Sequence, residues 1–480
     1  MPDLSQATRG AWYGLWTQAV DKVLPVVLLL YLARTLDADV FGVYAFVVAY
    51  LAFFQVVSDY SIDTVLVRTM SQRPDERRDL LRAGLGLKLA LAAGSAAVAT
   101  AFVVPASAGR VPPLLMLVAS LSLPTALGGA YRSYFRSVMA IRNVFLMAMV
   151  RATLLATGVI GAVAAGAGLE TIFVAMAIAN LSTFLLVAFV LRGEVRPGLR
   201  VDRAIWTRLV RGALPLMGNA FAMTVSLRAG HVLLMSMQGP VAVGQLGAAA
   251  RVTEAFTLLP EALMISMLPL MAGLHASDAP ALLRAAGRAA RYLVVTAGVP
   301  VLVCATAGDE LMALLFGRPF ASAGSILSLL SFTALLSATG TVLLNLLVAA
   351  HAERTLVRNT AVFAVVGVAL SVVLIGSHGA VGAAAAMLAT SVASQVSLSM
   401  LPSTRAYVAP TLRAAVRPFA AVLVAVAVGR MLPIPAAAAA VAALVAYVPA
   451  VWLLGVVEAD DAAFVRGALA SVARAPEEKR

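Results

Sequence analysis

Residues 83–104 read AGLGLKLALAAGSAAVATAFVV, an apolar run in which Lys88 is the single charged side chain. At a rise of about 1.5 Å per residue, a helix of this length spans the hydrocarbon core of a bilayer, which is about 30 Å thick. Similar runs recur along the whole chain of 480 residues, of which 61% are hydrophobic and 12% charged. A helix satisfies its own backbone hydrogen bonds, so lipid accepts it where loops and open sheets are excluded. The sequence therefore predicts an all-α integral membrane protein and excludes a soluble one.

The apolar runs predict about 14 transmembrane helices, with 12 as the alternative because the eleventh and thirteenth runs are short. The predicted spans are Trp12–Leu32, Phe41–Val57, Ala83–Val104, Val111–Ala130, Val144–Gly166, Leu169–Leu191, Gly212–Met235, Val243–Met267, Tyr292–Ala307, Ser325–Leu347, Thr360–Ile375, Val381–Leu401, Phe419–Met431 and Ala436–Val457. The connecting segments are too short to hold a further folded domain.

Basic residues alternate between the two sides of these spans as the positive-inside rule requires. With the N-terminus inside, most of the 36 Lys and Arg residues fall on the cytoplasmic side, and the C-terminus lies inside as well. The opposite side holds only Arg34, Arg110, Arg318 and Arg430. This asymmetry explains the net charge of +13 without a nucleic-acid partner. The polar N-terminus lacks the pattern of a cleavable signal, so we expect the first helix to be retained.

A weak internal repeat is found when the chain is shifted by 202 residues. Overall identity at this shift is near the chance level, but the matches lie at equivalent topological points. The matching pairs are Gly42 with Gly244, Phe54 with Phe256, Asp59 with Glu261, and Leu80–Ala83 with Leu282–Ala285. We therefore predict two parallel six-helix lobes, residues 1–200 and 201–402, followed by two accessory helices and a cytoplasmic tail in residues 403–480. Transporters often place their substrate site at the interface of such repeats.

Ionisable residues inside spanning helices are costly, so each one is a candidate functional residue. The candidate substrate-binding cations are Lys22, Arg151, Arg228 and Arg251. The candidate charge partners, which would position the cations or carry a coupling proton, are Asp21, Glu254, Glu261 and His231. A water-filled cavity with more basic than acidic groups selects anions, and the planar fork of arginine suits phosphate.

Each of these residues also has a structural interpretation. Asp21 and Lys22 could form buried ion pairs with another helix, and Arg251 could pair with Glu254 one turn away. His231 is more typical of a hydrogen-bonded core residue than of a proton switch. The long side chain of Arg151 could reach toward the membrane surface as readily as into the cavity, and we expect that of Lys88 to reach toward the surface. We also expect Pro260 to kink its helix.

The motifs of ATP use and hydrolysis are absent from the sequence. It contains no GxxxxGK[ST], HExxH or GxSxG and no Cys/His cluster with metal-ligand spacing, and its one cysteine, Cys304, is expected to be a buried core residue. Asp37 and Asp39 form a DxD in the first external loop, which a membrane glycosyltransferase or polymerase could use. Capping of the next helix is the simpler interpretation, because no external loop is large enough to build an acceptor site. We expect a transporter without a cofactor or metal, driven by an ion gradient or the membrane potential.

Four segments together resemble one family. They are YLARTLDADVFGVYAF from Tyr31, SDYSIDTVLVR from Ser58, RVTEAFTLLPEALMISMLPLMA from Arg251 and LMALLFGRPFASAGSILSLL from Leu311. The first two are similar to segments of lipid-linked oligosaccharide flippases. The third and fourth are similar to patterns of the whole multidrug/oligosaccharidyl-lipid/polysaccharide exporter superfamily.

The resemblance implies two six-helix bundles in a V, a cationic central cavity and alternating access. It also implies a cargo, an undecaprenyl-diphosphate-linked oligosaccharide for O-antigen, capsule or exopolysaccharide synthesis, which includes lipopolysaccharide. The lipid II flippase branch uses an arginine where Arg251 stands but has further arginines in its first two helices. Here the first helix offers Lys22 and the second offers none, which makes lipid II the less favoured cargo.

The expected function is therefore a multi-pass flippase of the bacterial cell inner membrane. Its expected partners are the lipid-linked oligosaccharide, membrane lipid and a polymerase or ligase of the same pathway. One alternative is a multidrug cation antiporter of the same superfamily, which predicts an acidic, aromatic cavity. Others are the membrane glycosyltransferase or polymerase and a purely structural member of a glycan assembly complex.

Overall fold

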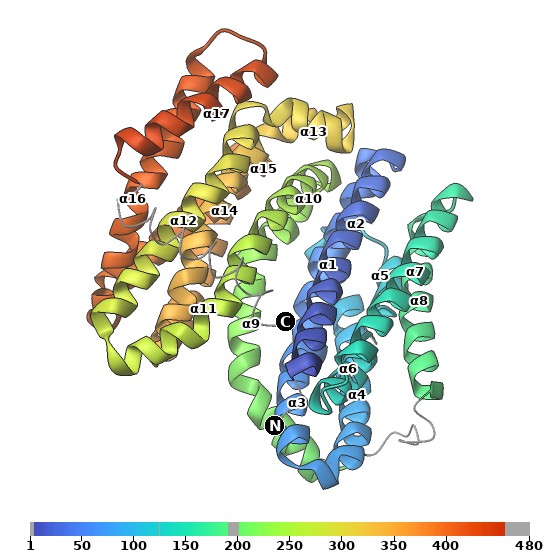
Figure 1. Cartoon of the computed structure of the whole chain (residues 1–480). Coiled ribbons are helices and arrows are strands. Elements are labelled where there is room, and N and C mark those ends of the chain that lie inside the picture. The colour runs from blue at the N-terminus through green and yellow to red at the C-terminus, as the bar shows by residue number, and fades with distance from the viewer. Residues whose placement is uncertain (1–3, 124, 191–200, 457–480) are drawn as a thin grey trace. The chain divides into compact units, whose positions relative to one another are not determined.

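The computed structural model describes residues 4–123, 125–190 and 201–456, and the regular structure in these ranges is helical throughout (Figure 1). The helices of the first half are α1 (Leu4–Thr35), α2 (Ala38–Gln55), α3 (Ser61–Gln72), α4 (Arg77–Ala106), α5 (Pro113–Ser120), α6 (Thr125–Ser137), α7 (Ile141–Ala164) and α8 (Leu169–Val190). Those of the second half are α9 (Arg203–Met237), α10 (Pro240–Glu254), α11 (Leu258–Ser277), α12 (Ala279–Thr306), α13 (Gly308–Phe316), α14 (Gly324–Ala349), α15 (Glu353–Met400), α16 (Pro402–Met431) and α17 (Ala436–Leu453). Short π or 3-10 turns join some of them.

Within the described residues, ten helical segments are long and apolar enough to cross a membrane. Their most apolar stretches have mean hydropathies between 1.3 and 2.4. The prediction of an all-α, multi-pass membrane protein is thereby confirmed, while the number fourteen stays a prediction. Part of the difference from ten arises because α15 is counted as one segment although it contains two predicted spans.

The helix α15 folds back on itself at Gly379, which has φ 56° and ψ −132°. A side chain built on Gly367 would lie 3.2 Å from the side chain of Thr390. In a straight helix these residues would be about 34 Å apart at about 1.5 Å per residue. The predicted spans Thr360–Ile375 and Val381–Leu401 are therefore two antiparallel arms, and Gly379 supplies a backbone conformation that L-residues avoid.

We expect Gly379→Ala to destabilise the protein by about 1–3 kcal/mol, because a methyl group at this φ and ψ strains the backbone. The matched control is Gly376→Ala on the same helix, where the added methyl would meet only Met237 Cε at 3.8 Å. The measurement is the thermal unfolding midpoint of purified protein in detergent. Equal midpoints for the two variants would contradict this account of the turn.

Two predicted spans are interrupted. The predicted span Val243–Met267 is divided into α10 and α11 by a 3-10 turn at Ala255–Thr257. This break confirms the kink expected near Pro260, whose ring nitrogen has no hydrogen to donate to the preceding turn. The prediction of one continuous span over Val111–Ala130 was wrong, because α5 ends at Ser120 and α6 begins at Thr125. Pro124 in the sequence between them acts against a continuous helix for the same reason.

The ends of the helices repeat at the same shift of 202 residues as the sequence matches. Helix α1 ends at Thr35 and α9 ends at Met237. Helix α2 begins at Ala38 and α10 at Pro240, while α4 begins at Arg77 and α12 at Ala279. The repeat is therefore present in the helix boundaries as well as in the sequence. The division of the chain into lobes at residues 200 and 402 stays a prediction.

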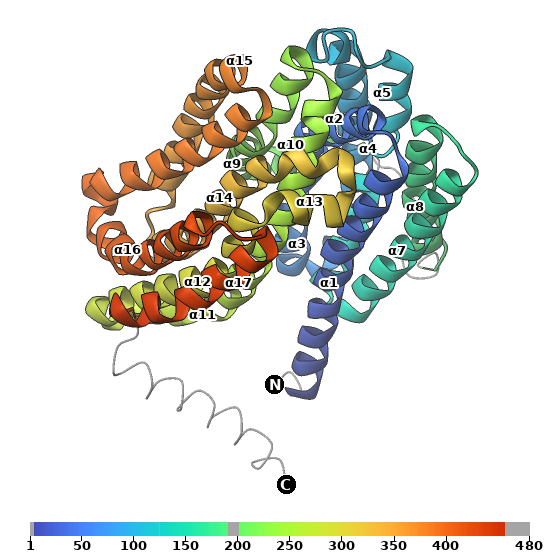
Figure 2. The same ribbon diagram turned by 90° about the horizontal axis from the view of Figure 1, so that it is seen from above.

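The described helices pack into two compact units. Unit 1 comprises Met1–Arg251, Met312–Ile326 and Val357–Thr390, and unit 2 comprises Val252–Leu311, Leu327–Leu356 and Ser391–Arg480. In unit 1, α1 lies beside α7, and α9 packs on α2, α3 and α4 (Figure 2). In unit 2, α12, α16 and α17 pack together, and Tyr447 donates a hydrogen bond to the carbonyl of Val295 at 3.0 Å. The predicted core residue Cys304 is buried there, at 2% exposure.

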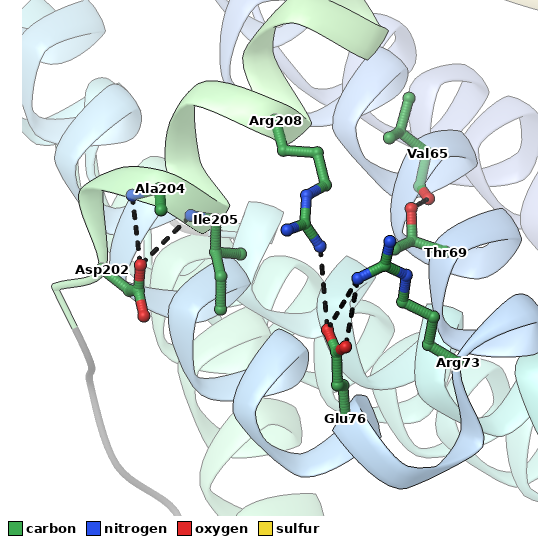
Figure 3. A network of polar contacts seen from close by, with 8 residues as sticks. All are labelled: Val65, Thr69, Arg73, Glu76, Asp202, Ala204, Ile205 and Arg208. Carbon is green, nitrogen blue, oxygen red and sulfur yellow. Dashed lines mark hydrogen bonds and ion pairs between the residues drawn. The ribbon is translucent and has the colours of Figure 1, made fainter.

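Polar contacts fix the beginning of α9 within unit 1 (Figure 3). The Asp202 carboxylate accepts hydrogen bonds from the backbone N–H groups of Ala204 and Ile205, both at 3.1 Å. This is N-cap geometry, which satisfies helix N–H groups that have no partner inside the helix. Nearby, Glu76 accepts from Arg73 at 3.1 Å and lies 3.7 Å from Arg208 of α9. The Arg208–Glu76 pair connects α9 to the corner between α3 and α4.

Candidate functional site

A small cavity in unit 1 brings together three of the predicted site residues. Arg228 and His231 reach it from α9, and Arg251 reaches it from α10. The cavity volume is about 20 Å³, which is room for about one water molecule. The remaining lining residues are Leu29, Phe41, Tyr44, Ala45, Val48, Ala49 and Gly247.

Residues related by the internal repeat face one another across this cavity. At the shift of 202, Leu29 corresponds to His231, Ala45 to Gly247 and Ala49 to Arg251, and all six line the cavity. When repeat-equivalent residues meet in this way, the space between them lies on the approximate two-fold axis that relates the repeats. At two of these three pairs the first repeat contributes an apolar side chain, Leu29 or Ala49, where the second contributes His231 or Arg251. The cavity is therefore charged on one half only.

The two repeats approach most closely beside the cavity, where α2 crosses α10. A methyl group built on Gly42 would lie 1.9 Å from the carbonyl oxygen of Pro240. One built on Gly244 would lie 3.3 Å from the Cα of Gly42, and one on Gly247 3.1 Å from the Cβ of Ala45. Small residues allow membrane helices to pack backbone against backbone. The glycines matched in the sequence are thus in contact with each other in the structure.

His231 is buried, with 2% of its surface exposed, and no described residue forms a hydrogen bond with its Nδ1. It lies one turn from Arg228 on α9, as the spacing predicted. A buried imidazole nitrogen without a protein partner is normally satisfied by solvent or ligand. The role of His231 as a core residue or a proton carrier stays a prediction.

Asp21 and Arg151 form an ion pair between α1 and α7. The Asp21 carboxylate accepts a hydrogen bond from Arg151 Nη2 at 2.6 Å, and each side chain is about one-third exposed, at 30% and 34%. This is the interhelical pair that we weighed as the alternative role for Asp21. Arg151 is held by Asp21 in this pair and is not among the residues that line the cavity. The side chain of Lys22 lies outside the described residues.

The other predicted residues lie apart from the cavity lining. Glu254 is half-buried on α10, one turn beyond Arg251, and Glu261 is exposed on α11. Both belong to unit 2. Lys88 does not reach toward the surface as expected, because it is completely buried and forms an ion pair with Asp63 of α3. It packs on the inner face of α4, which the sequence does not distinguish from the lipid face.

Sequence reasoning overlooked the part that α2 plays in the site. Tyr44 lines the cavity at 8% exposure and stacks on Phe173, with ring centroids 5.7 Å apart. The stripe Gly42, Ala45 and Ala49 carries no ionisable group, so a search for charges passes over it. The detectable signal was its spacing, because these small residues lie on one helix face and match α10 at the repeat shift.

We expect Asp21→Asn to destabilise the protein by about 1.5–3 kcal/mol, the value of a hydrogen bond to a charged group. The exchange Asp21→Arg with Arg151→Asp should recover most of this loss, because it restores an ion pair between α1 and α7. Thermal unfolding midpoints of the single and exchanged variants in detergent check this. An exchanged variant as unstable as the singles would show that the pair does not connect the two helices.

The fold is that of the transporters of the MOP superfamily. The lipid II flippase MurJ in an inward closed conformation is similar with a TM-score of 0.70 at 10% identity, over 92% of this chain and 98% of that chain. An inward-facing multidrug resistance MATE transporter is similar with a TM-score of 0.61 at 14% identity, over 82% and 96%. A Pyrococcus furiosus MOP transporter with a binding pocket of reverse polarity is similar with a TM-score of 0.53 at 12% identity, over 85% and 96%.

The profile of the polysaccharide biosynthesis protein family matches residues 7–275, more than half of the sequence. The chain therefore belongs to that family, and the resemblance inferred from the four sequence segments is confirmed. No curated protein matches the chain in the corresponding search.

Proposed function

We propose that the protein is a secondary transporter that moves a glycan repeat unit, linked to undecaprenyl diphosphate, across the bacterial inner membrane. The movement is from the cytoplasmic to the outer leaflet, and the glycan serves O-antigen, capsule or exopolysaccharide synthesis. The observation that carries the proposal is the cavity on the repeat axis, into which Arg228 and Arg251 project beside His231. Membership of a polysaccharide biosynthesis family supports the glycan as cargo.

The chemistry of the cavity suits a diphosphate. Each guanidinium carries a permanent charge and a planar set of donors that can bind two phosphate oxygens at once. In a membrane interior this attraction is stronger than in water, because few other dipoles compete for the charge. An acidic cavity for organic cations would require carboxylates among the lining residues, and the ten described lining residues include none.

The observed cavity is too small for the cargo. A volume of about 20 Å³ holds a water molecule but not a diphosphate. Cargo binding therefore belongs to a different conformation, in which α2 and α10 have separated and the arginines face a wider space. This is the behaviour of an alternating-access carrier, whose site is exposed to one side of the membrane at a time.

The remaining candidate residues have supporting roles in this proposal. Asp21 holds Arg151, which would approach the diphosphate when the pair opens, and Lys22 is the further cation of α1. Glu254, Glu261 and His231 are the groups that could carry a coupling proton, with an ion gradient or the membrane potential as the driving force. A polymerase or ligase of the same pathway would receive the flipped unit.

We expect Arg251→Gln and Arg228→Gln each to slow transport about 10- to 100-fold, because each removes a charge-assisted contact of about 1.5–3 kcal/mol. The matched control is Arg284→Gln, since Arg284 is an exposed arginine 3.8 Å from Asp278 on the protein surface. The measurement is the appearance of lipid-linked glycan in the outer leaflet of cells in which the chromosomal gene has been deleted.

Undiminished glycan export in both cavity variants would overturn the proposed role of the arginines. If deletion of the gene leaves export unchanged and instead raises sensitivity to cationic dyes, the multidrug antiporter becomes the function. Alanine at both Asp37 and Asp39 should leave export intact. Loss of glycan polymerisation in that variant would favour the glycosyltransferase alternative.

A second expectation follows from the repeat-related positions 49 and 251. The double variant Ala49→Arg with Arg251→Ala should regain part of the transport lost in Arg251→Ala alone, because both positions line the same cavity. The exchange also conserves the total side-chain volume, which packed interiors tolerate best. The same transport measurement checks it. A double variant no better than Arg251→Ala would show that the charge must lie on α10.

A further inference from the structure

Two arginines on the predicted external side bind the C-terminal ends of helices that belong to the other repeat. Arg34, in the last turn of α1, donates from Nε to the carbonyl of Leu315 at 2.9 Å and from Nη2 to the carbonyl of Leu314. Both carbonyls are in the last turn of α13. Arg110 donates to the carbonyl of Ser236 at 2.9 Å and to that of Met235, in the last turn of α9.

The ends of these helices suit a cationic partner. The last carbonyls of a helix have no N–H partner within it and carry the negative end of the helix dipole. Helix α9 is followed by Gly239 with φ 95°, and α13 by Gly317 with φ 98°, so neither helix continues past these carbonyls. Each arginine therefore supplies the donors that its target helix lacks.

The two contacts are related by the repeat. At the shift of 202, Arg34 corresponds to Ser236, the acceptor of Arg110. Arg110 corresponds to Met312, which lies in α13 just before the acceptors of Arg34. Each contact thus joins the end of the first helix of one repeat to the equivalent short segment of the other. A pair of contacts arranged in this way belongs to a two-fold interface.

The same interface includes the crossing of α2 and α10 at Gly42 and Gly244, and the cation cavity lies on the axis beside it. We infer that Arg34 and Arg110 are a paired latch that holds the two repeats together on the external side and thereby closes the cavity to that side. The inference rests on the proposed function only in requiring that the protein alternates between two conformations. Exposed arginine–carbonyl contacts are suited to this, because water can replace them when the latch opens.

The chain offers a matched control for the latch. Arg430, also predicted to be external, donates to the carbonyl of Ala305 in the last turn of α12 at 2.9 Å and to Ser328 at 3.0 Å. All three of these residues belong to unit 2. The chemistry is the same as in the latch, but this contact does not join the two repeats at the axis.

The test uses a single reporter cysteine, Val48→Cys, in a Cys304→Ala background, because Val48 lines the cavity. A membrane-impermeant, negatively charged thiol reagent is applied to right-side-out vesicles. We expect Arg34→Ala with Arg110→Ala to raise the labelling rate about tenfold, since charge-assisted contacts are removed from the closed state alone. Arg430→Ala should leave the rate unchanged. A double variant that labels at the parental rate would overturn the latch.

A second variant decides the matter if the double variant fails to accumulate. Gly244→Ala places a methyl group 3.3 Å from the Cα of Gly42 and should force the crossing apart, raising labelling in the same direction. Gly218→Ala on α9 has no neighbour within 4 Å of the added methyl and is the control. Unchanged labelling in Gly244→Ala would overturn the inference. The labelling rate does not depend on the cargo, so it tests the latch even if the proposed glycan cargo is wrong.

Discussion

The close contact between Gly42 and Gly244 is the constraint on which the rest of the site depends. With no side chain at either position, α2 and α10 approach until a methyl on Gly42 would overlap the Pro240 carbonyl. That approach brings Ala49 and Arg251 to the same cavity about two turns further along. It also brings the helix ends beyond the crossing close enough for arginine side chains to span. The meeting of Ala49 and Arg251 at one cavity thus depends on a packing contact between small residues.

The fold was largely predictable because the physics of the bilayer leaves few choices. Runs such as residues 83–104 must be helices, and the distribution of arginines sets the alternation of the spans. The breaks were less accessible. Pro260 led to the prediction of a kink, whereas Pro124, which marks the break after α5, was passed over because the run is apolar on both sides of it. Hydropathy measures whether a segment suits lipid and does not report where its backbone leaves the helix, so span limits were the weakest part of the prediction.

The sequence predicted which ionisable residues belong to the site much better than it predicted how they are paired. Arg228, His231 and Arg251 were singled out because charge is costly in a membrane, and the structure places them in one cavity. The same rule selected Arg151 without revealing that Asp21 accepts its hydrogen bond. For Lys88 the prediction of a side chain near the membrane surface was wrong. The energetic cost of burying a charge does not reveal which partner, here Asp63, offsets that cost. Pairing between helices depends on which faces meet, and a single sequence does not encode that in any local pattern.

The repeat axis through the cavity has a consequence for how such a chain can change. A residue that meets its own equivalent lies on the axis by necessity, so a half-length chain would present the same glycine to a second copy of itself. In a pair of identical chains, an arginine at the position of Arg251 would appear twice and face its own like charge across the cavity. Joining the halves in one polypeptide removes that requirement. Position 49 is alanine while position 251 is arginine, so the charge lies on one side of a cavity that repeat-related helices line together.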